Sequence, residues 1–188
     1  MPDQLTFRIE PSPFAQYSEC EFHRAPGPAC DEDCVGLRYR YLLGYPTAEG
    51  GNERICLFVL ANPSTATSRK VDPTVARCIK WAGQWGFGWC HVANVRAWRA
   101  TDPRDVPEDP KAIGPDNDRH IAEACRKAEL VVCGWGKLGG ARGPVVERII
   151  RDTGHVPHAL KLNADGSPGH PLYLPAAARP FPMEARHA

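Results

Sequence analysis

A run of apolar residues, Leu57-Phe58-Val59-Leu60-Ala61, stops abruptly at the polar segment Asn62-Pro63-Ser64-Thr65. The length and composition of the run predict a buried strand, and the Asn-Pro step ends it. Ligands of open α/β sheets bind outside the carboxyl ends of the strands. The polar loop over residues 62–72 is therefore the first candidate for a functional site.

The rest of the chain alternates between strand and helix patterns. Period-2 alternation or short apolar runs predict strands, and apolar residues at helical spacing between caps predict helices. The strands are expected at 36–44, 54–61, 89–95, 130–133 and 158–162, and the helices at 73–85, 115–128 and 144–153. This order predicts an α/β fold, a three-layer α/β/α sandwich with a largely parallel central sheet.

The composition is that of a soluble globular protein. Of the 188 residues, 43% are hydrophobic and 24% are charged, and no stretch approaches the roughly 20 apolar residues that span a membrane. The N-terminal segment lacks the pattern of a secretory signal, so we expect a cytoplasmic location and no membrane partner. We divide the chain into an irregular Cys- and Pro-rich arm (1–34), a single α/β domain (35–175) and a polar tail (176–188).

Cysteine and histidine in the arm raise the question of a metal. Cys20, His23, Cys30 and Cys34 are ligand types that suit zinc, although their spacing is not that of a standard knuckle. An iron–sulfur cluster would need a fourth thiolate, from Cys78 or Cys90. The alternative is a set of reduced thiols in a loosely ordered arm. Five further cysteines lie within apolar or helical patterns and are expected to be buried thiols: Cys56, Cys78, Cys90, Cys125 and Cys133.

Four loops follow strands, or lie near the last strand, and are expected at one edge of the sheet. They contain Asn62 to Thr65, then Asn94 with Arg96 and Trp98, then Gly134 to Lys137, and finally His170-Pro171. The chain has no GxGxxG, GxxxxGK[ST] or GxSxG motif, which argues against a dinucleotide-binding fold, a P-loop NTPase and an α/β-hydrolase.

Each polar candidate has a functional and a structural interpretation. Asn62 either caps the turn, or holds a water or reads a base edge, and Asn94 either reads a base edge or is a satisfied structural amide. Ser64 is favoured as a turn residue, and Asp72 as a helix N-cap over a general base. His170 is a competent acid or oxyanion partner if its turn presents it to a pocket.

The remaining candidates would contact a ligand through a ring or a charge. Trp135 either stacks on a ligand or belongs to the core. Between residues 62 and 101 there are six basic residues and one acid, Asp72. The basic residues form either a surface that faces phosphates or a solvated surface with scattered charges. The basic residues are Arg69, Lys70, Arg77, Lys80, Arg96 and Arg99.

These residues together resemble a bacterial and phage family catalogued as a domain of unknown function, DUF1643. The resemblance covers about residues 34–175 and brings no established activity. It is carried by Leu60-Ala61-Asn62-Pro63-Ser64-Thr65-Ala66, Asp72-Pro73-Thr74, Trp85-Gly86, Asn94, Arg99-Ala100-Thr101-Asp102-Pro103, Gly114-Pro115-Asp116-Asn117-Asp118, Trp135-Gly136 and His170-Pro171-Leu172-Tyr173-Leu174.

The layout is also similar, more loosely, to the uracil-DNA glycosylase superfamily. That resemblance implies that Asn62 orients the hydrolytic water, Asn94 reads an extruded base and His170 supports the departing base. Ser64 stands where the asparagine-type members have glycine, and no aromatic residue follows Pro63 closely. The stacking ring would then come from Trp98 or Trp135.

The leading hypothesis is a base-recognising hydrolase of the DNA glycosylase type, which needs no cofactor and acts on nucleic acid or a nucleotide. Asn62, His170 and Asp72 are its candidate catalytic residues. Its candidate substrate-binding residues are Pro63, Ser64, Thr65, Asn94, Arg96, Trp98, Trp135 and Lys137. The alternatives are a non-catalytic nucleic-acid or nucleotide binder on the same scaffold, and a metal-dependent enzyme that uses the cysteine arm.

Overall fold

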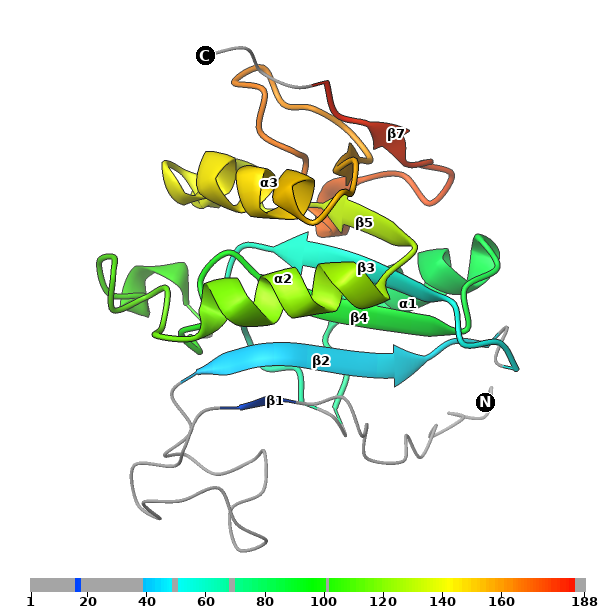
Figure 1. Cartoon of the computed structure of the whole chain (residues 1–188), viewed down its shortest axis with the longest axis horizontal. Helices are drawn as coiled ribbons and strands as arrows, with labels where there is room; N and C mark the ends of the chain where they lie inside the picture. The colour runs from blue at the N-terminus through cyan, green and yellow to red at the C-terminus, as the bar shows by residue number, and fades with distance from the viewer. Residues whose placement is uncertain (1–15, 18–38, 49–50, 68–69, 101, 185–188) are drawn as a thin grey trace, which may run out of the picture.

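The computed structural model describes residues 16–17, 39–48, 51–67, 70–100 and 102–184. Its strands form a sheet in the order β1-β2-β4-β3-β5-β6-β7 (Figure 1). The strands are β1 (Gln16–Tyr17), β2 (Arg40–Pro46), β3 (Ile55–Leu60), β4 (Trp89–Asn94), β5 (Leu130–Cys133), β6 (His158–Ala159) and β7 (Phe181–Pro182).

The centre of the sheet is parallel and its two sides are antiparallel. β3 pairs in parallel with β4 and β5, and β5 pairs in parallel with β6. β2 runs antiparallel to β1 and β4, and β7 runs antiparallel to β6. The sheet is therefore mixed and mostly parallel. Leu60 and Asn94 are register partners, which places the carboxyl ends of β3 and β4 side by side.

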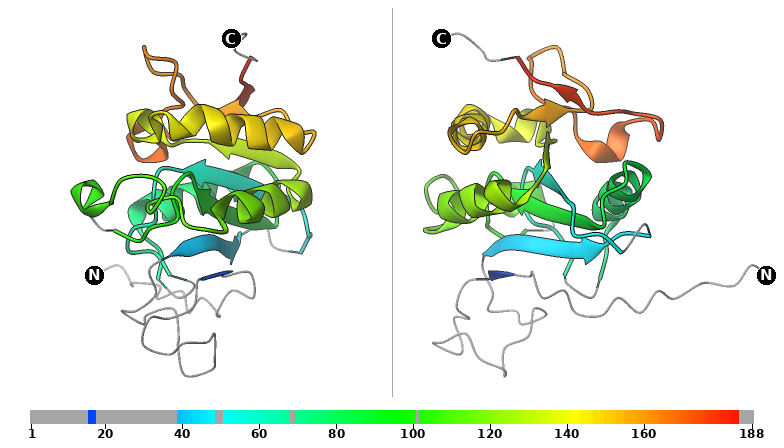
Figure 2. Two further views of the ribbon diagram at one scale, coloured as in Figure 1. Left: turned by 60° about the vertical axis from the view of Figure 1, so that its left-hand side comes forward. Right: turned by 45° about the vertical axis from the view of Figure 1, so that its right-hand side comes forward.

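Helices cover both faces of the sheet, as expected. α1 (Pro73–Gln84) lies on one face, and α2 (Asn117–Lys127) and α3 (Arg142–Asp152) lie on the other (Figure 2). Short 3₁₀ turns complete the described elements: η1 (Pro103–Asp105), η2 (Gly136–Gly139) and η3 (Pro171–Tyr173). In the described part of the chain no helix is both long and apolar enough to cross a bilayer.

The alternation of side chains along β3 explains the two hydrophobic cores. Leu57 and Val59 pack in the cluster beneath α2 and α3, whereas Cys56 and Phe58 pack in the cluster with residues of α1. Because β3 is covered on both faces, its sequence reads as a continuous apolar run. The five cysteines expected in the core are buried free thiols.

Two segments near the carboxyl end differ from the pattern in the sequence. The strand expected at 158–162 is short, since β6 ends at Ala159 and Leu162 pairs instead with Pro168 in an isolated bridge. In the segment 176–184, β7 adds to the edge of the sheet. Met183, 4% exposed, packs in the core, and its N–H donates to Pro157 O at 2.8 Å.

Candidate functional site

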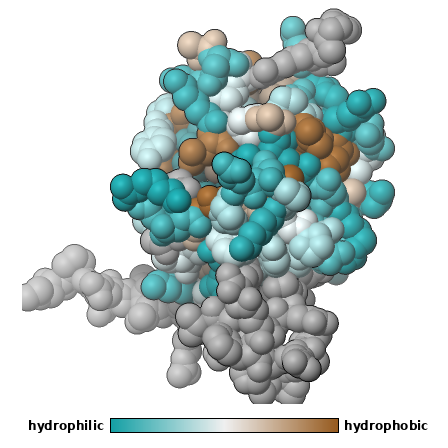
Figure 3. All heavy atoms as spheres, turned by 90° about the vertical axis from the view of Figure 1, so that its left-hand side faces the viewer, coloured by the Kyte–Doolittle hydropathy of each residue, from teal (hydrophilic) through white to brown (hydrophobic). Residues whose placement is uncertain are grey.

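A cavity of about 660 Å³ opens at the edge of the sheet where β3, β4 and β5 end. Figure 3 views the molecule from this side and shows hydrophilic side chains with separate hydrophobic patches among them. Seven of the residues that the sequence singled out line the cavity. They are Asn62, Ser64, Asp72, Asn94, Trp135, Lys137 and His170.

Asn94 is the last residue of β4 and is 1% exposed. Arg40 Nη2 donates to Asn94 Oδ1 at 3.2 Å, and Arg40 Nη1 donates to Ala66 O at 2.6 Å. An arginine has donors alone, so the amide must turn its oxygen toward the guanidinium. Asn94 Nδ2 has no hydrogen-bond partner among the described residues, and it is left as a donor for a ligand in the cavity.

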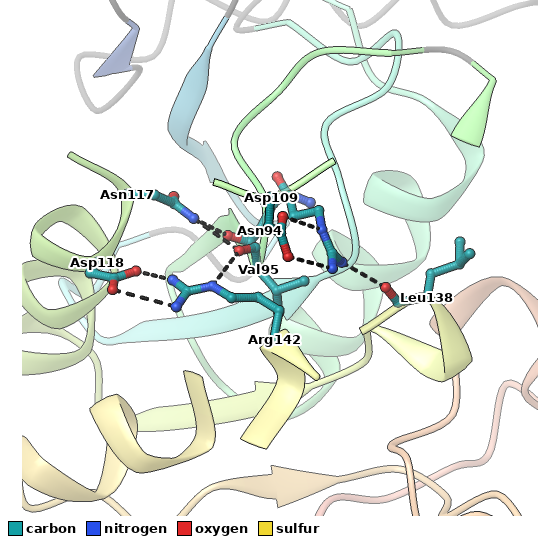
Figure 4. Close-up of polar contacts among 8 residues, drawn as sticks. Asn94, Val95, Asp109, Asn117, Asp118, Leu138 and Arg142 are labelled. Carbon is teal, nitrogen blue, oxygen red and sulfur yellow. Dashed lines mark hydrogen bonds and ion pairs between the residues drawn. The ribbon is translucent and has the colours of Figure 1, made fainter. Parts of the chain in front are cut away.

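A second set of contacts holds the main chain at the end of β4 (Figure 4). Asn117 Nδ2 donates to Asn94 O at 3.0 Å and to Val95 O at 3.2 Å, and Arg142 Nε donates to Val95 O at 3.1 Å. Arg142 is in turn paired with Asp118. Residues that begin α2 and α3 therefore position the strand end that carries Asn94.

Asn62 follows β3, and main-chain carbonyl groups hold its side-chain amide. Its Nδ2 donates to Ala100 O at 3.1 Å and to Pro63 O at 3.2 Å. Within the described residues its Oδ1 has no donor. Both amide hydrogens are directed at main-chain carbonyls, so the free group of Asn62 is an acceptor, of the kind that orients a water or an N–H group.

His170 precedes η3 and is half-buried. Its Nδ1 accepts from Leu172 N at 3.4 Å, which places the ring proton on Nε2. Burial lowers the pKa of His170, and the nearby carboxylate of Asp72 partly opposes this. The imidazole is therefore a neutral Nε2–H donor at neutral pH, a form suited to stabilising a developing negative charge.

Asp72 is the helix N-cap that the sequence favoured. Its Oδ1 accepts from Val75 N at 2.8 Å, and Pro73 occupies the first turn of α1. It is also the one carboxylate among the described residues that line the cavity. Ser64 is half-buried at the same wall. These contacts leave Asp72 Oδ2 without a hydrogen-bond partner among the described residues.

The Trp135 ring belongs to the core. It is 4% exposed, and a Cβ at Gly139 would lie 2.1 Å from its Cδ1. A Cβ at Gly143 would lie 2.7 Å from its Nε1. Two glycines therefore let η2 and α3 approach the indole closely, and Trp135 closes the cavity wall from within the core. This favours the core interpretation over ligand stacking.

Four predicted binding residues do not line this cavity. Arg96 pairs with both oxygens of Asp109 at 2.9 Å and donates to Leu138 O at 2.8 Å, beside a neighbouring hollow of about 340 Å³. Trp98 packs edge-on against Tyr39 and lies under the Lys111 ammonium. Pro63 is buried, and Thr65 is exposed outside the cavity.

The predicted metal ligands Cys20, His23, Cys30 and Cys34 lie outside the described residues. Within the described part of the chain, no group of three or more Cys, His, Asp or Glu side chains could hold a metal ion. The described cavity therefore offers hydrogen-bond donors and acceptors rather than a ligand set for a cation.

A family model described as "Protein of unknown function (DUF1643)" matches residues 40–172. The chain belongs to this family. The matched span contains Asn62, Asn94 and His170, and excludes the cysteine arm. No curated protein and no solved structure matched the chain. The DUF1643 description carries no activity.

The sequence did not point to several residues of this DUF1643 cavity. Arg40 reaches it from β2, Lys161 and Asn163 from the segment after β6, and Tyr173 from η3. A charged residue at the start of an otherwise apolar strand was the available signal for Arg40. Tyr173 belongs to the His170–Leu174 motif but was not predicted as a site residue. Lys161 carried no local signal, because it reaches the cavity through the fold.

Proposed function

We propose that the chain is an N-glycosidic hydrolase of the DNA glycosylase type, whose cavity takes in a nucleobase of nucleic acid or a nucleotide. The observation that carries the proposal is the set Asn62, Asn94 and His170. Each reaches the same cavity from a different segment, and each has one polar atom held by the protein and another without a described partner.

The free atoms match the three tasks of such a reaction. Asn62 Oδ1 accepts a hydrogen bond from the attacking water, and Asn94 Nδ2 donates to an acceptor on the base edge. When the glycosidic bond breaks, its electron pair leaves with the base, and His170 Nε2–H stabilises the charge. The water oxygen then bonds to the anomeric carbon, and its proton passes to solvent.

The looser resemblance to the uracil-DNA glycosylase superfamily supports the same assignment. The order of an Asn-Pro loop, a strand-end asparagine and a late His-Pro turn is kept in this sequence. A glycosylase-like version of the α/β fold is part of this proposal. An enzyme of this kind extrudes its target base into a pocket, and a cavity of about 660 Å³ has room for a base and its sugar.

The test is incubation with oligonucleotides that carry uracil or a modified base, scored for abasic sites by alkaline cleavage. We expect excision of at least one base, with Asn62→Ala, Asn94→Ala and His170→Ala each slower by roughly 100-fold or more. Gln84→Ala, an exposed amide at the end of α1, is the matched control and is expected to retain wild-type activity. Absence of cleavage for every oligonucleotide, with or without binding, would contradict the proposal.

One observation favours a non-catalytic binding protein as the second candidate. Asp72 is the one described carboxylate at the cavity, and one of its oxygens is engaged in capping α1. This candidate predicts salt-sensitive binding of the same oligonucleotides without abasic sites. Charge reversal at Lys70 or Arg99 would then weaken binding.

A metal-dependent enzyme is the third candidate, and it rests on the cysteine arm of the sequence alone. Elemental analysis of purified protein tests this candidate. Zinc or iron at a near-stoichiometric level would support it, and the absence of both metals at that level would rule it out.

A further inference from the structure

The mouth of the cavity carries exposed residues that the reaction itself does not need. Tyr173 is 81% exposed and Leu138 is 55% exposed, and both line the cavity together with the exposed cations Lys137 and Lys161. Isolated exposed apolar residues are common on proteins and mean little. Here an aromatic ring, an aliphatic side chain and two cations surround one opening.

Tyr173 stands on a rigid turn. Arg77 donates from Nη1 to Leu172 O at 3.0 Å and from Nη2 to Leu174 O, so a side chain of α1 holds the middle of η3 and the residue that follows it. Pro171 is buried against Gly134, where a Cβ would lie 2.8 Å from Pro171 Cδ. The exposed ring is therefore presented by a fixed backbone, which reduces the entropy that a ligand must offset on binding.

Tyr173 also lies next to the proposed reaction centre. Its ring centroid is 5.7 Å from that of His170, with the two planes tilted by 48°. A group that stacks on Tyr173 would therefore sit near His170 and beside whatever occupies the cavity. Because the ring is 81% exposed, we assign it to the mouth of the cavity, where it would contact a neighbour of the bound base rather than that base.

The charges at the mouth favour an anionic ligand. Lys137, Lys161 and the buried Arg40 line the cavity, and Asp72 is the one carboxylate among its described lining residues. Asp165 lies within electrostatic range of Lys137, and its carboxylate accepts from Ser167 N at 3.0 Å and from Ser167 Oγ at 2.6 Å. The two exposed ammonium groups line the cavity and are available to contact phosphates of a strand whose base enters it.

We infer that the natural ligand is a polynucleotide strand in a single-stranded or locally unpaired form. Tyr173 stacks on the base that neighbours the one in the cavity, and Lys137 and Lys161 contact the flanking phosphates. Stacking platforms combined with cations are the general means by which proteins hold unpaired strands. This inference rests on the proposed function and names its substrate class, a strand rather than a free nucleotide.

The experiment measures binding by the full chain, so it does not depend on catalysis. Fluorescence anisotropy would compare a labelled 15-nucleotide oligo-dT, the same strand in a duplex, and thymidine monophosphate as competitor. We expect the single strand to bind most tightly, with a dissociation constant that rises with salt. Each of Lys137→Ala and Lys161→Ala should lower the slope of log K against log salt by about 0.7.

Variants of the ring separate stacking from folding. Tyr173→Ala should weaken strand binding by about 10-fold or more, and Tyr173→Phe should keep it, because the stacking face is retained. Phe181→Ala is the matched control, an exposed aromatic in β7 that does not line the cavity. Equal binding by wild type and Tyr173→Ala, or binding that is insensitive to salt, would overturn the inference. Self-association that Tyr173→Ala abolishes, without strand binding, would assign the ring to a protein interface instead.

The two proposals fail in different ways. Tight, Tyr173-dependent binding of the single strand without base excision would contradict the hydrolase and keep the strand as ligand. Excision from a free nucleotide as fast as from a strand would keep the hydrolase and overturn the strand inference.

Discussion

Arg40 Nη2 lies 3.2 Å from Asn94 Oδ1, and this hydrogen bond joins two buried side chains that are 54 positions apart in the sequence. The bond decides which end of the amide faces the cavity. With Oδ1 held, Asn94 offers a donor, and a ligand that it recognises must present an acceptor. The recognition chemistry of the cavity is therefore set by a residue on a different strand.

Replacing Arg40 by methionine should reduce stability and binding together. The change leaves Asn94 Oδ1 and Ala66 O without the guanidinium that they share, and an unsatisfied buried acceptor costs about 1–3 kcal/mol. Urea denaturation measures the loss, and oligonucleotide binding reports whether Asn94 still presents its donor. Arg54→Met is the matched control: its ion pair with Glu129 is about half exposed, so a change below about 1 kcal/mol is expected.

Asn117 should act on the site without touching the cavity. Asn117→Asp replaces the donor to Asn94 O and Val95 O with an acceptor at a fully buried position, which we expect to lower the free energy of unfolding by about 2–4 kcal/mol. Thermal denaturation is the measurement. Asp116→Asn, at the exposed preceding position, is the control, and equal effects of the two changes would refute a specific role for Asn117.

The two roles of Asp72 can be separated by paired substitutions. Asp72→Asn keeps an oxygen that can accept from Val75 N, so the helix cap should survive while the carboxylate is lost. Asp72→Ala removes both, and we expect it to destabilise the protein by about 1 kcal/mol. If the rate of base excision falls in both variants, the negative charge of Asp72 contributes to the reaction. If the rate falls in Asp72→Ala alone, the helix cap is the important contribution.

Stability should depend on pH through His91. Burial, together with the nearby charge of Lys127, lowers the pKa of His91 to about 4 from an ordinary value of 6.5. The unfolded chain takes up a proton at this residue between pH 6.5 and 4, and the folded chain does not. The contribution of neutral His91 to the free energy of unfolding is therefore present above pH 6.5 and is lost as the pH falls to about 4. By linkage it is on the order of 3 kcal/mol.

Denaturant unfolding at several pH values measures this dependence against His91→Gln. Carboxyl groups titrate in part of the same window, so the difference between the two proteins is the quantity of interest. We expect that difference to shrink steadily from pH 6.5 to 4. A constant difference over this range would show that His91 does not titrate differently in the two states.

Local patterns in the sequence were sufficient for most of the elements. The apolar run before Asn62 is β3, and the Asp72-Pro73 step is the start of α1, because capping and burial on both faces leave local marks. The strand predicted at 130–133 is β5 with the same bounds. The expected strand at 158–162 was too long, since the main-chain pairing that limits it to Ala159 involves β5 and β7, which are distant in sequence.

The sequence by itself determined the order of the elements, the caps, the buried cysteines and which strand ends carry polar residues, because each depends on neighbours along the chain. The tertiary structure alone decided that Arg40 turns the amide of Asn94, that Arg96 is engaged with Asp109 and that Trp135 is packed beneath Gly139 and Gly143. These are contacts between segments that are far apart in sequence. Hydrogen-bond geometry and steric fit select among such contacts. Both are defined once the segments have packed against one another, so local sequence patterns do not reveal them.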